Sequence, residues 1–231
     1  MTDLKQFWQR HEYLSTGLLW AAIVVVLFRD VLTSGAERVI AGRDVSYLFL
    51  PWLRYFVESV RQGLFPLWNP YLFSGTPFVA NPQPALFYPA NWLALWLGPE
   101  RAVGLNTALH VWIAAVGAYG WLREMDATRG GAFFASAAYA LSGFVTVRIL
   151  AGHYGIVLEA AWLPVVMWAV MRALNRRSIA RAVVAGLPFG MMTLAGHTPT
   201  FALLSLGAGL TVCFEAIRSA RSRMPQGASA A

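Results

Sequence analysis

The sequence predicts an all-α integral membrane protein with about six transmembrane helices and one large extracytoplasmic loop after the first of them. Hydrophobic residues make up 58% of the 231-residue chain and charged residues only 13%, whereas an average soluble domain carries about 25% charged residues. So few charges could not cover the surface of a soluble fold, so lipid must form part of the solvent. The apolar residues also fall into runs of about the length that crosses a bilayer.

The expected spans belong to one transmembrane domain over residues 1–217. Polar segments separate them, the clearest of which covers residues 172–181. The spans are expected over Leu14–Leu32, Ala102–Leu122, Gly131–Ile149, Tyr154–Met171, Ala182–Ala195 and Thr200–Ile217. Residues 218–231 are basic, small and polar, and we expect them to form a disordered cytoplasmic tail.

The first apolar run has two interpretations. Ser34–Ala36, directly behind it, resembles the small-residue site at which a signal peptide is cleaved. The apolar core of this first run is long and contains Trp20, which favours an uncleaved membrane anchor. In either case the chain that follows is exported.

Residues 33–99 are too interrupted to span a membrane and are expected to form the outer loop. Eight of the 12 prolines lie between Pro51 and Pro99, and proline removes backbone donors that lipid cannot replace. Trp and Tyr recur in the same segment and favour the membrane–water boundary. We therefore expect the loop to lie on the membrane surface.

Two parts of this loop are expected to be interfacial helices. Val45–Gln62 is amphipathic, with Arg54 and Glu58 at i,i+4 spacing, as in a helical ion pair. Leu86–Leu97 is apolar but too short to cross a bilayer, which suits an interfacial or re-entrant segment.

The distribution of basic residues predicts that both termini face the cytoplasm. Cytoplasmic loops of membrane proteins are enriched in Lys and Arg. With the N-terminus inside, eleven of the 18 basic residues fall on the inner side, namely Lys5, Arg10, Arg123, Arg129, Arg172, Arg176, Arg177, Arg181, Arg218, Arg221 and Arg223. We attribute the net charge of +7 to this topology and expect no nucleic-acid partner.

In this topology the polar residues that are costly in a membrane collect near the outer side: Asp44, Asn69, Asn81, Gln83, Arg148, His153 and His197. Glu159 lies one to two turns into the fourth span from the same side. A carboxylate there is either a functional group or a protonated or hydrogen-bonded packing residue. Asn106 and His110, in the second span, are expected to form hydrogen bonds between helices.

A short repeat links two of these residues, because Leu150–His153 and Leu194–His197 both read Leu-Ala-Gly-His. One interpretation is a tight turn permitted by Gly and Ala, with His at the membrane boundary. The other is that the two histidines frame one outward-facing cavity, where histidine can bind phosphate, shuttle a proton or ligate metal. The sequence has no close-spaced metal motif, and Cys213 is the only cysteine, so we predict neither a metal nor another cofactor.

Asp44 also has two interpretations. It begins the amphipathic segment, where a lone Asp is commonly a helix N-cap or a solvated residue. Alternatively it is a general base, which requires a positioned carboxylate near an acceptor hydroxyl.

Several spaced motifs together resemble the bacterial YfhO-like membrane proteins, a family related to the GT-C glycosyltransferases. They are an acidic residue just after the first span, Pro66–Tyr71, Gly75–Phe78, Asn81–Gln83 and the two Ala-Gly-His turns. The resemblance covers about residues 14–217. It implies a multi-pass enzyme of the bacterial inner membrane that takes a sugar from a polyprenyl-phosphate carrier at the outer face, and delivers it to an envelope glycan or lipid.

The resemblance also implies roles for single residues. An acidic residue in the first outer loop of GT-C enzymes acts as base, and Asp44 is its match here. Basic and histidine residues near the outer boundary hold the carrier phosphate, and Arg148, His153 and His197 are suitably placed. Glu159, Asn81 and Gln83 complete the expected substrate-binding set.

Other classes of function stay open. Family members are usually much longer, which leaves a split form that needs a partner membrane subunit, or a non-catalytic subunit that binds a lipid-linked glycan. A transporter is the third class. It is the least favoured, because the repeated unit contains two spans, so its copies run parallel rather than inverted, and the polar residues cluster on one side.

Overall fold

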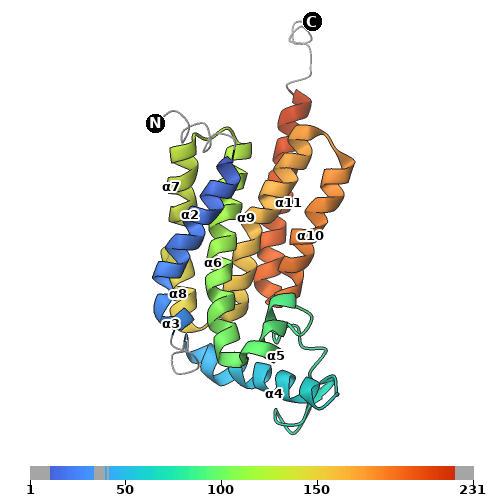
Figure 1. Ribbon diagram of the computed structural model, residues 1–231. Helices are drawn as coiled ribbons and strands as arrows, with labels where there is room; N and C mark the ends of the chain where they lie inside the picture. Colours follow the sequence, from blue (N-terminus) through green and yellow to red (C-terminus); the bar gives the residue numbers. More distant parts are fainter. Residues whose placement is uncertain (1–10, 34–39, 41, 222–231) are drawn as a thin grey trace, which may run out of the picture.

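The computed structural model describes residues 11–33, 40 and 42–221. Three features of the sequence therefore lie outside the described residues: the candidate cleavage site at 34–36, the basic residues Lys5, Arg10 and Arg223, and the last part of the expected tail, 222–231. The described chain is a bundle of long helices with an irregular segment gathered at one end (Figure 1).

The bundle is built from helices that run back and forth along it (Figure 1). The helices are α2 (Glu12–Leu27), α3 (Arg29–Thr33), α6 (Pro99–Glu124), α7 (Arg129–Ala140), α8 (Gly143–Ala151), α9 (Tyr154–Arg176), α10 (Ile179–Leu194) and α11 (Thr198–Arg221). Within the described residues, four helical segments are long and apolar enough to cross a membrane: α6, α7 with α8, α9, and α11. The apolar helices α2 and α10 have 16 residues each. The all-α membrane class is confirmed, while six spans stay a prediction.

Two expected spans are interrupted. The first breaks at Phe28, between α2 and α3. The third expected span breaks before α8, where the Ser142 hydroxyl accepts a hydrogen bond from the Val145 backbone N–H at 3.3 Å and so caps the new helix.

Two polar segments are more helical than expected. The loop expected over 172–181 is reduced to Arg177 and Ser178, because α9 continues through Arg176 and α10 begins at Ile179. Similarly, α11 continues to Arg221, inside the segment expected to be a tail. A span predicted from hydropathy ends where the apolar residues end. The helix itself continues into the polar segment, because Arg, Leu and Ala all favour helix.

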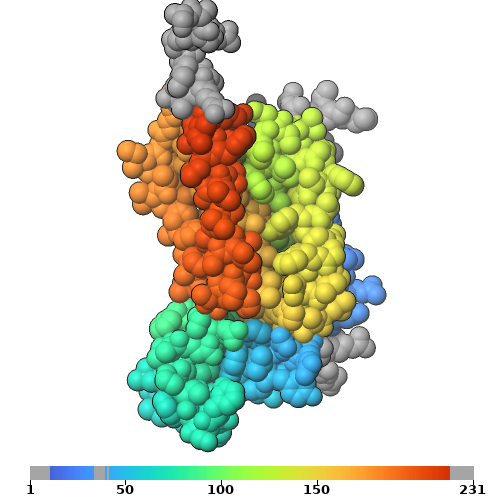
Figure 2. Space-filling view, turned by 180° about the vertical axis from the view of Figure 1, so that it is seen from behind, coloured from blue at the N-terminus to red at the C-terminus, as the bar shows by residue number. Residues whose placement is uncertain are grey.

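Helices α6 and α9 form the centre of the bundle. In the candidate span on α6, 72% of the residues are buried inside the protein, and on α9 61%, whereas on α11 only 6% are buried. Figure 2 shows α11 running along the surface of the bundle. The outer helices therefore present their apolar faces to the surroundings, as expected for a protein solvated by lipid.

The loop segment (residues 42–98) covers the end of the bundle opposite to the start of α2 and the end of α11; we call this the loop end (Figure 1). Its elements are the π-helical turn η1 (Val45–Phe49), α4 (Leu50–Arg61), β1 (Trp68–Asn69), β2 (Thr76–Pro77), the 3₁₀ turn η2 (Pro89–Leu93) and α5 (Ala94–Leu97). The two short strands pair antiparallel, with Trp68 opposite Pro77.

The amphipathic helix expected in this segment is α4, but its expected ion pair is wrong. Arg54 does not pair with Glu58. Its Nε donates instead to Oε1 of Glu100 at the start of α6, at 2.8 Å. Helical spacing predicts only local partners, and here the helix lies against the beginning of α6.

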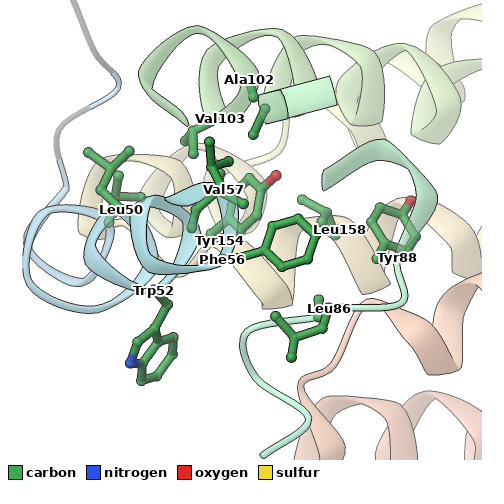
Figure 3. Close-up of a cluster of buried hydrophobic side chains, with 14 of the residues drawn as sticks. Leu50, Trp52, Phe56, Val57, Leu86, Tyr88, Ala102, Val103, Tyr154 and Leu158 are labelled. Atoms are coloured by element: carbon green, nitrogen blue, oxygen red, sulfur yellow. The ribbon is translucent and has the colours of Figure 1, made fainter. Parts of the chain in front are cut away.

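A hydrophobic cluster fastens the loop segment to the bundle (Figure 3). Phe56 and Val57 of α4 pack with Val103 of α6 and with Leu158 of α9, and Leu86 of the loop closes the cluster. Phe56 is 1% exposed and Leu158 is fully buried. Burying a side chain of this size stabilises by roughly 1.5–3 kcal/mol, so the segment is part of the folded body.

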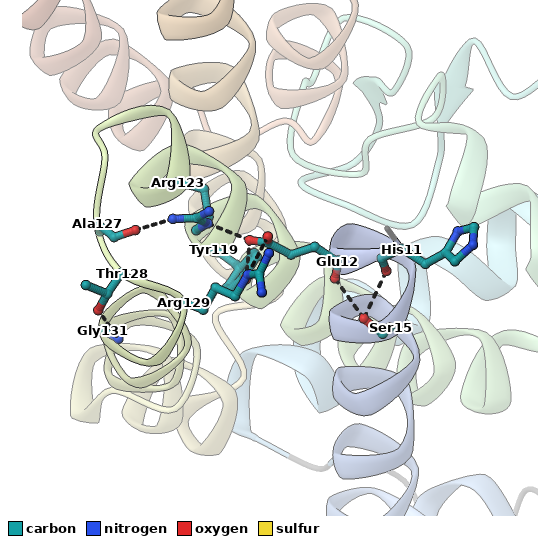
Figure 4. A network of polar contacts seen from close by, with 9 residues as sticks. All are labelled: His11, Glu12, Ser15, Tyr119, Arg123, Ala127, Thr128, Arg129 and Gly131. Atoms are coloured by element: carbon teal, nitrogen blue, oxygen red, sulfur yellow. Dashed lines mark hydrogen bonds and ion pairs between the residues drawn. The ribbon is translucent and has the colours of Figure 1, made fainter. Parts of the chain in front are cut away.

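At the opposite end of the bundle, a single carboxylate joins three helices (Figure 4). Oε1 of Glu12 accepts from the Tyr119 hydroxyl at 2.7 Å and from Arg123 Nε at 2.5 Å, and Oε2 accepts from Arg129 Nε at 2.7 Å. These contacts hold the start of α2 against the end of α6 and the start of α7.

We expect Glu12→Ala to lower the free energy of unfolding by about 1–3 kcal/mol, because three donors lose one acceptor while solvent still screens the arginines. Glu215→Ala is the matched control, since its carboxylate pairs with Arg218 only three residues away, a contact worth roughly 0.5 kcal/mol or less. Thermal unfolding in detergent measures both. Equal effects would contradict the role of Glu12 as a tie between helices.

Candidate functional site

Asp44, His153 and Arg148 form a contiguous polar group at the loop end. Asp44 Oδ2 lies 3.4 Å from His153 Nε2, and Arg148 Nη1 donates to His153 Nδ1 at 2.7 Å. The guanidinium of Arg148 also lies 5.2 Å from the ring centre of Phe144. The three residues come from the start of the loop segment, the end of α8 and the turn before α9, so the fold joins parts of the chain that are far apart in sequence.

These contacts define the tautomer of His153. A guanidinium can only donate, so Nδ1 of His153 must accept, and the ring proton of the neutral imidazole lies on Nε2. Nε2 lies 3.4 Å from Oδ2 of Asp44. The group therefore offers one carboxylate acceptor next to two donors, Arg148 and His153.

The side chain of Asp44 does not act as a helix cap. The residue has helical backbone angles, φ −70° and ψ −32°, and its side chain makes no capping hydrogen bond. It is 38% exposed and faces His153. The geometry therefore does not support capping, and the interpretations that stay are a solvated residue and a general base.

His197 and Glu159 lie at the second Ala-Gly-His turn. Glu159 is fully buried, and its Oε1 accepts from the His197 backbone N–H at 2.5 Å. Among the described residues no donor reaches Oε2. The His197 ring accepts at Nδ1 from the Thr200 backbone N–H at 3.3 Å, which again leaves Nε2 as the site of the ring proton.

His197 is close enough to the first group for their charges to interact. Burial lowers the pKa of the His197 imidazole, and the positive charge of Arg148 acts in the same direction. The ring therefore stays neutral at pH 7 and keeps its donor at Nε2. Arg148, His153 and His197 are thus three N–H donors at the same end of the bundle, a set of side chains that suits an anion.

The two turns share a second property, since each packs directly on the backbone of the loop segment. Gly152 and Gly196 have φ +83° and +92°. A Cβ on Gly152 would meet the backbone of Gly42 at 2.8 Å, and one on Gly196 would meet the Pro82 carbonyl oxygen at 2.2 Å. The repeat is therefore a turn that only glycine can make here, and it also fixes the loop segment in place.

Asn81 and Gln83 lie beside the second turn. The Asn81 Oδ1 accepts from the Gln83 backbone N–H at 3.1 Å, and Gln83 is exposed. Asn81 lines a cavity of about 200 Å³ between the loop segment and the end of α10. In the part of the chain that the structure describes, no hydrogen bond or ion pair joins either residue to Asp44 or to the histidines.

A buried hydrogen-bond network joins the loop segment to helices α6 and α9 next to the site. Trp162 Nε1 donates to the Tyr88 hydroxyl at 2.7 Å, Tyr88 bonds to His110 Nε2, and His110 Nδ1 donates to the Asn106 carbonyl at 2.6 Å. Burial raises the pKa of Tyr88 above its ordinary value, so its hydroxyl keeps the proton that it donates.

The same network continues to the first residue of α9. Asn106 Nδ2 donates to the Tyr154 hydroxyl at 2.7 Å and to Asn91 Oδ1 at 3.1 Å, while Tyr154 donates to Asn91 Oδ1 at 2.9 Å. Asn106 bonds between helices as expected, whereas His110 bonds to Tyr88 of the loop segment and to a carbonyl of its own helix. Their partners Tyr88, Asn91 and Tyr154 were not predicted, because an aromatic or Asn in an irregular loop carries no signal of its partner.

No group of three His, Cys, Asp or Glu residues that could hold a metal ion is found within the described ranges. Comparisons with models of protein families, with curated proteins and with solved structures find no match for this chain.

We expect Gly196→Ala to lower the free energy of unfolding by about 2 kcal/mol or more, since alanine at positive φ costs roughly 1–2 kcal/mol and its Cβ would strike the Pro82 carbonyl. The matched control is Gly207→Ala on α11, where a Cβ meets open space. That change should be neutral or stabilise by up to about 1 kcal/mol. Thermal unfolding followed by tryptophan fluorescence compares the two, and equal loss in both would refute the turn's special role.

The lowered pKa of His197 predicts a pH dependence of stability. As the pH falls through about 6.5, the unfolded ring takes up a proton before the folded one, so the protein loses stability as the pH falls below that value. In His197→Asn, which keeps a side-chain acceptor but does not titrate, the drop in melting temperature over this range should be smaller. An unchanged drop would show that His197 does not contribute to it.

Proposed function

We propose that this chain is a membrane glycosyltransferase of GT-C type that uses a polyprenyl-phosphate-linked sugar at the outer face of the bacterial inner membrane, with both termini in the cytoplasm. The observation that carries the proposal is the contact between Asp44 and His153, at 3.4 Å, with Arg148 bound to the other side of the same ring. These contacts place Asp44, the proposed base, next to N–H donors that suit a phosphate.

In the proposed reaction, Asp44 accepts the proton of an acceptor hydroxyl, whose oxygen attacks the anomeric carbon of the donor sugar. The bond between that carbon and the carrier phosphate oxygen breaks, and the phosphate leaves with the electron pair. Arg148 and the Nε2–H groups of His153 and His197 stabilise the negative charge that develops on it. Direct displacement with inversion is the simplest form of this reaction.

The loop segment suits a site at a membrane surface. Several of its aromatic side chains are exposed, including Tyr71 at 79% and Trp96 at 75%, and such side chains favour the membrane–water boundary. In the proposed reaction these residues keep the carrier near the site and limit the access of water, which would otherwise hydrolyse the donor.

The test is mass spectrometry of envelope glycans and polyprenyl-linked sugars from cells that lack this gene and carry a complementing copy. We expect the deletion to lose one sugar, wild type to restore it, and Asp44→Asn to reduce transfer by about 10²–10⁴-fold, as for loss of a general base. Asp126→Asn is the control, because Asp126 lies at the opposite end of the bundle and its backbone, at φ +61°, suits Asn.

The other outcomes are equally informative. If Asp44→Asn restores the sugar as well as Asp126→Asn does, Asp44 is not the base, and a non-catalytic subunit that binds a lipid-linked glycan or a partner becomes the better account. If the deletion leaves every glycan unchanged, the transferase proposal fails for this chain.

A further inference from the structure

A groove between α9 and α10 lies beside the turn that joins these helices. That turn is at the end of the bundle opposite to the loop segment, far from the Asp44 group (Figure 1). It has a volume of about 550 Å³, within the range of small-molecule sites. Its lining is Val165, Trp168, Ala169, Arg172, Ser178, Ala180, Arg181, Val184, Leu187 and Pro188. None of these residues takes part in the proposed transfer reaction.

The lining is divided along the groove. Arg172, near the end of α9, and Arg181, near the start of α10, both lie next to the connecting turn. Val165 and Pro188 each lie seven residues further from that turn along their helices, or about 10 Å at 1.5 Å per residue. The groove is therefore cationic at one end and apolar at the other, which is the arrangement that an amphiphile requires.

The charged end is only partly neutralised from within the protein. Arg172 Nε lies 3.9 Å from Glu124 Oε1, at the outer limit of an ion pair, and Glu124 does not line the groove. Arg181 has no ion pair among the described residues. Its backbone N–H donates to the Ser178 hydroxyl at 3.3 Å, so Ser178 keeps its own hydrogen to donate to a ligand.

The apolar end is exposed on the surface of the bundle. Val184 is 58% exposed and Leu187 is 69% exposed, on a chain whose outer faces are apolar. Trp168 forms part of the opposite wall, stacked on Tyr13 at 5.4 Å, and its Nε1 has no acceptor among the described residues. Lipid is the surrounding medium best suited to this face.

We propose that the groove binds a phospholipid with an anionic headgroup, the phosphate at Arg172 and Arg181 and the acyl chains along Val184 and Leu187. Basic pockets between membrane helices are suited to such headgroups, because positive charge and apolar surface meet there at the depth of the lipid phosphate. The site is independent of the proposed transferase activity, and either can fail without the other.

The test is native mass spectrometry of the full chain in detergent, titrated with phosphatidylglycerol or with phosphatidylcholine of the same acyl chains. We expect phosphatidylglycerol to be retained preferentially and Arg172→Gln/Arg181→Gln to weaken its binding about 30-fold, since each arginine near an anionic headgroup contributes roughly a factor of five. Arg176→Gln/Arg177→Gln removes the same charge at the same turn from residues outside the groove, and should change binding less than threefold.

A further variant separates a built site from simple charge attraction. Val184→Trp fills the apolar end and leaves both arginines in place, so it should also weaken phosphatidylglycerol binding by about tenfold. Thermal unfolding in neutral detergent shows whether each variant still folds. If the Arg172 and Arg181 double variant does not, Arg181→Gln alone replaces it, because this exposed side chain forms no ion pair with the described residues.

Three results would overturn the proposal: equal loss in both double variants, no loss in Val184→Trp, or equal retention of the two lipids. Inorganic phosphate supplies the last comparison. If phosphate alone binds in an Arg172- and Arg181-dependent manner and is insensitive to Val184→Trp, the site recognises phosphate and not a phospholipid.

Discussion

The buried hydrogen bonds between the loop segment and the helices α6 and α9 are the constraint on which the loop end depends. Asn91 is 3% exposed and Asn106 is fully buried, so each polar atom that loses its partner there costs about 1–3 kcal/mol. In the observed position the loop segment supplies Asn91 and Tyr88 as partners in these bonds. Tyr154 belongs to this network and directly follows His153, so the same bonds fix the histidine that contacts Asp44.

Hydrogen bonds alone do not bring Asp44 to the bundle, and the backbone contacts at the two glycine turns complete the arrangement. Because Gly152 has no side chain, the backbone of Gly42, two residues before Asp44, can pack directly against it. The chain around Pro82 packs against Gly196 in the same way. The two turns occupy one end because the unit between them is a helical hairpin, which returns the chain to the side from which it began.

The sequence predicted the elements of the site better than their contacts. Apolar runs located the helices, and the Leu-Ala-Gly-His repeat located both turns, because these signals are local. The partner of Arg54 was predicted wrongly as Glu58, since i,i+4 spacing cannot anticipate that α4 packs against Glu100. Glu12 was missed because a carboxylate preceding an apolar run gives no indication of arginines more than a hundred residues later.

The two ends of the bundle differ in a way that bears on the class of function. At the loop end, a carboxylate, a guanidinium and two imidazoles lie around turns held by an ordered segment. The opposite end is dominated by arginines, among them Arg123 and Arg129, which Glu12 holds. Glu159, the fully buried carboxylate of α9, bonds to the His197 turn and so belongs to the loop end. A transporter has a polar substrate site near the midplane of the membrane, which opens to each side in turn. An arrangement with a carboxylate and several N–H donors at one end of the bundle instead suits the transferase proposed above.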